Sequence, residues 1–153
     1  MDRPPDHCGE LIMPFVSITR LRVRSWEFLP GFFYQTLRSA LQARSAEGQL
    51  HFGLLRDAHN TYWTRTVWTS EQTMKSFMTS GAHRHAMPRL LKWCDEAAIA
   101  HWSQDSPDPP RWNEAHRQLL GIGRPSKVLY PTEAHRRHEL PPPRLQGDQS
   151  ETK

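Results

Sequence analysis

The alternation of hydrophobic and polar residues predicts a first strand over residues 15–24. This segment is rich in β-branched residues, which favour strands. Its apolar positions change parity between Ile18 and Leu21. Such a change fits either a β-bulge or a strand that is partly buried on both faces.

A first helix is indicated by apolar residues at every fourth position, namely Leu29, Phe33, Leu37 and Leu41. This spacing places them on one helical face. Pro30 lies just inside the expected start, where its missing N–H costs little. Gly48 closes the segment.

The segments 49–58 and 61–69 are expected to form a hairpin, joined by turn-forming residues at 57–60. Ser70 is a candidate N-cap for a second helix. Gly81 interrupts that helix, and Pro88 is expected to kink or restart it because proline lacks the donor for a helical hydrogen bond. Its apolar face continues through Leu90, Leu91 and Cys94. A fourth strand follows over residues 97–103, and a short helix ends near 120.

The predicted order is β-α-β-β-α-β, which is the ferredoxin-like pattern of the α+β class with a four-stranded antiparallel sheet. Both helices would lie on one face of that sheet. The other face would be bare, and a bare apolar face needs cover from a second copy of the chain or a ligand. We therefore expect a homodimer.

Composition divides the chain into four parts: a flexible arm (1–13), the ferredoxin-like domain (14–104), a helical extension (105–130) and a tail (131–153). The tail has four prolines, many charges and few apolar residues. Because so little apolar surface cannot offset the entropy of ordering, we expect the tail to be disordered.

The charge and cysteine content argue against several classes of protein. The net charge is +4, but the 20 basic residues are scattered, which does not favour a nucleic-acid-binding surface. The two cysteines form no CxxC pair, so neither a disulfide framework nor a metal site is expected. We expect no membrane span, and a cytoplasmic location, because no signal-like or membrane-length apolar segment is present.

His83 is the leading candidate for chemistry. On a continuous helix it shares an apolar face with Met87 and Leu90, while His85 points the opposite way. A neutral imidazole in apolar surroundings can act as a base or ligate haem iron. A structural role, bonded to a backbone carbonyl, is the alternative.

Trp63 and Trp68 are five residues apart, so an unbulged strand directs them to opposite faces. One would pack beneath the helices and the other would face a pocket or a dimer partner. Arg65 shares the face of Trp63 and can receive a carboxylate or a haem propionate. His51 and His101 are further candidates for the lining of a cavity. The sequence contains no Ser-His-Asp arrangement and no phosphate-binding glycine loop, so neither a hydrolase nor a kinase is indicated.

Three segments together resemble the dimeric α+β barrel superfamily, and within it the spheroidene-monooxygenase-like and antibiotic-biosynthesis-monooxygenase-like proteins. They are Phe-Val-Ser-Ile-Thr-Arg-Leu at 15–21, Trp-Thr-Arg-Thr-Val-Trp at 63–68 and Ser-Gly-Ala-His-Arg-His-Ala-Met at 80–87. The most specific pieces are Trp68 and the run from Phe77 to His83. The likeness spans residues 15–102.

The resemblance implies an oxygenase-type pocket between the sheet and the second helix. The family often places an Asn on the first strand, where this chain has only Ser17 or Thr19. The expectation is a monooxygenase-like enzyme acting on a small hydrophobic or aromatic molecule. With haem, His83 would be the axial ligand and Arg65 the propionate partner. Without a cofactor, His83 would deprotonate a phenol stacked on Trp63 or Trp68. A non-catalytic ligand-binding or dimerisation module of the same fold is the alternative.

Overall fold

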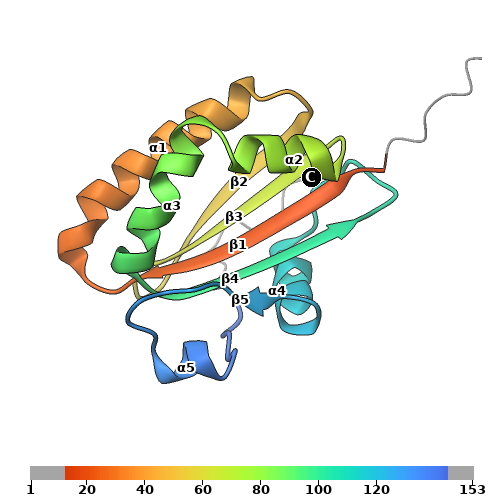
Figure 1. The fold of residues 1–153 in the computed structure, drawn as a ribbon. Coiled ribbons are helices and arrows are strands. Elements are labelled where there is room, and N and C mark those ends of the chain that lie inside the picture. Colours follow the sequence, from red (N-terminus) through yellow and green to blue (C-terminus); the bar gives the residue numbers. More distant parts are fainter. Residues whose placement is uncertain (1–12, 145–153) are drawn as a thin grey trace, which may run out of the picture.

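The computed structural model describes residues 13–144 as one five-stranded antiparallel sheet with helices on both faces (Figure 1). The strand order is β2-β3-β1-β4-β5. The strands are β1 (Phe15–Val23), β2 (Gln49–Asp57), β3 (Thr61–Trp68), β4 (Cys94–Ser103) and β5 (Arg124–Pro125). The helices are the 3-10 turn η1 (Trp26–Phe28), then α1 (Leu29–Ser45), α2 (Glu71–Met78), α3 (Gly81–Trp93), α4 (Trp112–Gly121) and α5 (Glu133–Arg136).

The predicted α+β, ferredoxin-like arrangement is confirmed. β1 pairs with both β3 and β4, and β2 pairs with β3, which gives the antiparallel four-stranded core expected of this pattern. α1, α2 and α3 lie together on one face (Figure 1). The short strand β5 adds a fifth strand beside β4.

The expected second helix is two helices, and the break lies before Gly81. Gly81 has a φ of +55°, a conformation that favours glycine, so α2 ends and α3 starts in a new direction. Pro88 lies inside α3, which neither ends nor restarts there. Cys94, placed by its periodicity on the helix, instead begins β4.

The regular apolar stripe of α1 faces solvent and not the core. The helix buries Phe32, Gln35 and Ala43 against the rest of the fold. Phe33, Leu37 and Leu41 are exposed. The four-residue spacing correctly indicated a helix, but it marked the outer face.

The second face of the sheet is covered by the chain itself. Val16, Ile18 and Trp63 pack there in one core with Trp112, Ala115 and Leu119 of α4. The intervening residues of β1 point toward α1–α3. The change of apolar parity along β1 therefore reflects burial on both faces, and the sheet face that was expected to be bare has intramolecular cover.

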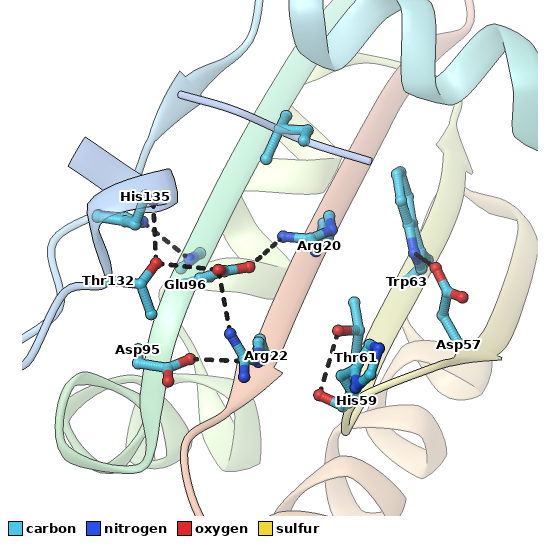
Figure 2. Close-up of polar contacts among 12 residues, drawn as sticks. Arg20, Arg22, Asp57, His59, Thr61, Trp63, Asp95, Glu96, Thr132 and His135 are labelled. Carbon is cyan, nitrogen blue, oxygen red and sulfur yellow. Dashed lines mark hydrogen bonds and ion pairs between the residues drawn. The ribbon is translucent and has the colours of Figure 1, made fainter. Parts of the chain in front are cut away.

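The segment 131–144, expected to be disordered, is ordered: it is attached to β4, as Figure 2 shows for Thr132 and His135, and to α4 through His138. The Thr132 hydroxyl donates to Glu96 at 2.9 Å, and the backbone N–H of Ala97 donates to Nδ1 of His135 at 3.2 Å. His138 donates from Nε2 to the carbonyl of Leu119 at 2.8 Å. These polar contacts, together with Leu140 packing against the core, hold the segment in place.

The rest of the expected arm and tail, residues 1–12 and 145–153, lies outside the described residues. Within residues 13–144, no helix has the length and apolar character needed to cross a membrane.

Candidate functional site

A cavity of about 160 Å³ lies between the sheet and the helices α1–α3. The strands contribute hydroxyl and aromatic side chains, including Ser17, Thr19, Thr64, Thr66, Phe52 and Trp68. The helices contribute mostly apolar groups, including Phe32, Met74, Phe77, Met87 and Leu90. The cavity is therefore apolar with hydroxyl groups along one wall, a lining typical of small-molecule sites.

His83 lines this cavity and has a defined tautomer. Its Nδ1 lies 3.1 Å from the carbonyl oxygen of Met78. A carbonyl can only accept, so Nδ1 carries the hydrogen and Nε2 keeps its lone pair. Burial lowers the pKa of His83 below its usual 6.5, although the hydrogen bond to Met78 opposes this. At neutral pH, His83 is an uncharged imidazole with a free basic nitrogen.

The position of His83 is set by Gln42 on α1. Oε1 of Gln42 accepts from the backbone N–H of His83 at 2.8 Å, and its Nε2 donates to the carbonyl of Ser80 at 2.8 Å. A Cβ added at Gly81 would lie 3.1 Å from the amide carbon of Gln42. One amide side chain thus holds the start of α3, and Gly81 gives it the space to do so.

Trp68 forms a rigid wall of the cavity. Its ring lies 5.1 Å from that of Phe77, centroid to centroid, and is fully buried. The indole N–H donates to the hydroxyl of Thr66 at 2.9 Å. Because this polar edge is satisfied, the buried indole is held at a fixed position in the cavity wall.

Gln35 is a cavity residue that the sequence reasoning missed. It projects from α1, is buried, and its Oε1 finds no hydrogen-bond donor among the described residues. A buried acceptor without a donor costs about 1–3 kcal/mol. A polar residue in the middle of an amphipathic helix was the available signal, but the phase assigned to α1 placed it on the outside.

The other predicted site residues lie elsewhere. Trp63 is on the face covered by α4, where its indole N–H donates to Asp57 at 3.0 Å. Arg65 is also there, donating to the carbonyl of Pro110 at 2.7 Å and stacking over Trp112. His51 lies near Arg65. Burial lowers the pKa of His51, and the positive charge of Arg65 lowers it further.

Of the three expected pocket-lining residues, Thr19 alone lines the cavity. His101 is on the helix-covered side but packs against Phe15, with ring centroids 5.7 Å apart, outside the cavity lining. The structure therefore brings together Thr19, Trp68 and His83, and separates them from Trp63, Arg65 and His51.

The residues present do not fit haem. Pockets for ligands of drug size span roughly 300–1,000 Å³, whereas this cavity has about 160 Å³. Arg65, the expected propionate partner, lies across the sheet from His83. Among residues 13–144, no cluster of three or more His, Cys, Asp or Glu side chains is placed to hold a metal ion.

One family profile matches part of the sequence, and several solved structures have a similar fold. The sequence profile described as antibiotic biosynthesis monooxygenase matches residues 30–89. Rv0793 from Mycobacterium tuberculosis is 12% identical with a TM-score of 0.55, over 60% of this chain and 94% of that one. No curated protein matches the sequence.

Two further solved structures have names that describe a chemistry. A variant of SnoaB, a cofactor-independent oxygenase from Streptomyces nogalater, is 16% identical with a TM-score of 0.52, over 61% of this chain and 94% of that one. A putative antibiotic biosynthesis monooxygenase from Nitrosomonas europaea is 13% identical with a TM-score of 0.52, over 60% and 90%. At these identities the likeness establishes a shared fold.

Proposed function

We propose that this chain, whose residues 30–89 match the antibiotic biosynthesis monooxygenase profile, is an enzyme of that type and oxygenates a single-ring phenol without a bound cofactor. The observation that carries the proposal is His83, a neutral base whose Nε2 accepts no hydrogen bond from the described residues and whose side chain lines a largely apolar cavity. Trp68, fully buried against Phe77, supports the aromatic part of the cavity wall.

The size of the cavity selects the size of the substrate. An engineered apolar cavity of about 150 Å³ binds benzene. The cavity of about 160 Å³ therefore suits one aromatic ring with small substituents. Fused multi-ring compounds exceed this volume.

The polar groups of the cavity favour a substrate that carries hydroxyl groups. The Oε1 atom of Gln35 is a buried acceptor that a substrate O–H would satisfy. His83 is a second acceptor, through Nε2. Two acceptors in one apolar cavity suit a dihydroxybenzene, with one hydroxyl on each.

The proposed reaction needs molecular oxygen and no other reactant. His83 takes the phenolic proton as electrons move from the ring to oxygen and a ring carbon–oxygen bond forms. Cleavage of the O–O bond then leaves a quinone and releases water, so that phenol plus O₂ yields quinone plus H₂O. Because a phenol has a pKa near 10, above that of His83, proton transfer accompanies the oxidation rather than completing beforehand.

The test is oxygen uptake with a panel of single-ring phenols, together with binding followed by tryptophan fluorescence. We expect His83→Gln to retain binding within a few-fold and to lose oxygen uptake by about 10²–10⁴-fold, the usual contribution of a positioned general base. His85→Gln, which changes an exposed histidine two residues away, is the matched control and should leave both unchanged.

Binding without oxygen uptake in the unmodified protein would instead support a non-catalytic ligand-binding module. Loss of folding in His83→Gln, seen by circular dichroism, would make His83 a structural residue. Neither binding nor turnover of any single-ring phenol would reject the proposed substrate class.

A further inference from the structure

The outer side of α1 carries a regular apolar stripe. Phe33, Leu37 and Leu41 fall within about 80° of one another at about 100° per residue. They are 45%, 60% and 56% exposed, and Tyr34 beside them is exposed as well. A surface helix ordinarily turns such a stripe toward the core, so an outward stripe indicates a partner that accepts apolar side chains.

α3 lies beside α1 on the same face of the sheet, and its outer side is basic (Figure 1). Arg84, Arg89 and Lys92 are exposed there and fall within about 140° of one another. None of the three forms an ion pair with another residue of the described segment 13–144. Their charges are therefore available to an anionic partner.

The two helices together concentrate the positive charge of the chain. α1 adds Arg38 and Arg44, both exposed, and neither helix contains an aspartate or a glutamate. The five basic residues of α1 and α3 exceed the net charge of +4, so the remainder of the chain carries one net negative charge. Basic residues that are scattered along the sequence are thus gathered on one surface by the fold.

We propose that the outer surface of α1 and α3 docks this chain on an anionic lipid membrane. The α1 stripe enters the boundary between headgroups and acyl chains, as the apolar face of an interfacial helix does, and the basic side chains meet the lipid phosphates. A nucleic acid also offers phosphates, but it has no apolar phase and would leave Leu37 and Leu41 in water. Only a lipid surface complements both helices.

The cavity borders this surface at Met87. This α3 side chain is exposed and is also part of the cavity lining. A docked chain therefore holds that part of the cavity close to the membrane, in which a hydrophobic phenol is concentrated. Supply of substrate from the membrane rests on the proposed function, whereas the docking itself does not.

The test is cosedimentation of the full chain with vesicles of phosphatidylcholine alone or of phosphatidylcholine mixed with phosphatidylserine. At about 0.1 M salt, we expect binding to the mixed vesicles to be at least about 100-fold tighter than binding to the neutral ones. At about 1 M salt the Debye length falls from about 10 Å to about 3 Å, so most of this preference should be lost.

Two variants test the two helices separately. Arg84→Gln, Arg89→Gln and Lys92→Gln combined should weaken binding to the mixed vesicles about 100-fold, because each basic side chain near an anionic surface strengthens binding about fivefold. Leu37→Gln combined with Leu41→Gln should weaken it by at least about tenfold, because these side chains no longer enter the apolar phase. All five positions are exposed, so the fold should survive, as circular dichroism can verify.

Arg117→Gln, Arg136→Gln and Arg137→Gln combined is the matched control. It removes the same charge from α4 and α5, which lie away from α1 and α3 (Figure 1), and these side chains are also exposed. The control should keep vesicle binding within a few-fold. Equal losses in the two triple variants would mean that the charge of the whole chain, and not this surface, attracts the lipid, and would overturn the proposal.

Three further results would overturn the proposal. The first is an unmodified protein that does not bind the mixed vesicles. The second is binding that the Leu37/Leu41 double substitution leaves unchanged, because the stripe then does not enter the lipid. The third is tighter binding to a single-stranded oligonucleotide than to the mixed vesicles, which would make nucleic acid the partner. None of these measurements involves phenol oxidation, so they leave the proposed function to its own test.

Discussion

The two faces of the sheet differ in how they are filled. On the side of α1–α3, the strands present hydroxyls and Trp68 to a cavity. On the side of α4, Trp63, Trp112 and Leu119 form a core in which the charged pair Arg20–Glu96 is also buried. Both tryptophans of β3 are fully buried, but Trp68 is among the residues that line the cavity and Trp63 belongs to the core beneath α4.

Alternate residues of one strand therefore have different roles: those on the cavity side can contact a ligand, and those on the α4 side stabilise the fold. A side chain on the cavity side keeps some freedom to contact a ligand. A side chain on the α4 side is held by packing, by the Arg20–Glu96 ion pair and by the hydrogen bonds of Thr132 and His135 (Figure 2). Substitutions on the two faces should therefore have different consequences.

The largest effect is expected for Glu96→Ala on the α4 side. Glu96 pairs with Arg20 at 2.9 Å, and both side chains are almost fully buried. Removing the carboxylate leaves an uncompensated buried guanidinium and should cost about 3–5 kcal/mol in the free energy of unfolding. Urea denaturation measures this cost, and ligand binding to the remaining folded protein should be unchanged.

Glu71→Ala is the control for Glu96→Ala. Glu71 pairs with Lys75 at a similar 2.9 Å, but both side chains are more than half exposed. The loss should be no more than about 0.5 kcal/mol, as for other exposed helix pairs. Similar losses for the two variants would mean that the α4 face is not the more tightly packed one.

A smaller and mixed effect is expected for Gly81→Ala on the cavity side. Alanine at a φ of +55° should cost about 1–2 kcal/mol. The new methyl group also meets the amide of Gln42, which bonds to the backbone of His83. We therefore expect weaker phenol binding and slower oxygen uptake in addition to the lower stability.

The control for that substitution is Gly121→Ala at the end of α4, where an added Cβ meets nothing within 4 Å. It should be neutral or stabilise by up to about 1 kcal/mol, and it should leave binding unchanged. If Gly81→Ala loses stability but binds and turns over phenol normally, Gln42 does not position His83 for chemistry.

The strands and their two faces could be predicted because alternation is a local property of the sequence. It correctly directed Trp63 and Trp68 to opposite faces. The cover of the second face could not be predicted in this way. Besides Leu140, which packs on the core, residues 131–144 are held by Thr132, His135 and His138, whose bonds to distant partners leave no mark in local hydropathy.

The site was predictable only in part for a related reason. The periodicity around His83 placed it on an inner helical face, and it lines the cavity. Strand parity grouped Arg65 with Trp63, as observed, but it could not say which face holds the cavity. Gln35 was missed because the most regular apolar stripe of α1 faces solvent. That stripe was expected to face the core, so the face that carries Gln35 was expected to be exposed, whereas it is buried.

The smallest expected effect is the pH dependence of stability and of oxygen uptake. It should distinguish the two faces of the sheet, because His83 lies on one side and His135 on the other. Burial lowers the pKa values of both His83 and His135 below 6.5. The unfolded chain then binds protons more readily, so the stability that each neutral histidine contributes is complete above pH 6.5 and declines as the pH falls through the folded-state value. Oxygen uptake should be flat near pH 7 and fall on acidification, as His83 loses its free lone pair.

Thermal denaturation and oxygen uptake, each measured from pH 7.5 down to pH 5 in unmodified protein and in His135→Gln, distinguish the two contributions. His135 accepts a hydrogen bond from the backbone of Ala97 through Nδ1, which a protonated ring cannot do. Its substitution should flatten the pH dependence of stability while leaving the acid limb of oxygen uptake in place. If His135→Gln shifts that acid limb instead, the two faces of the sheet are coupled and the division of roles between them is wrong.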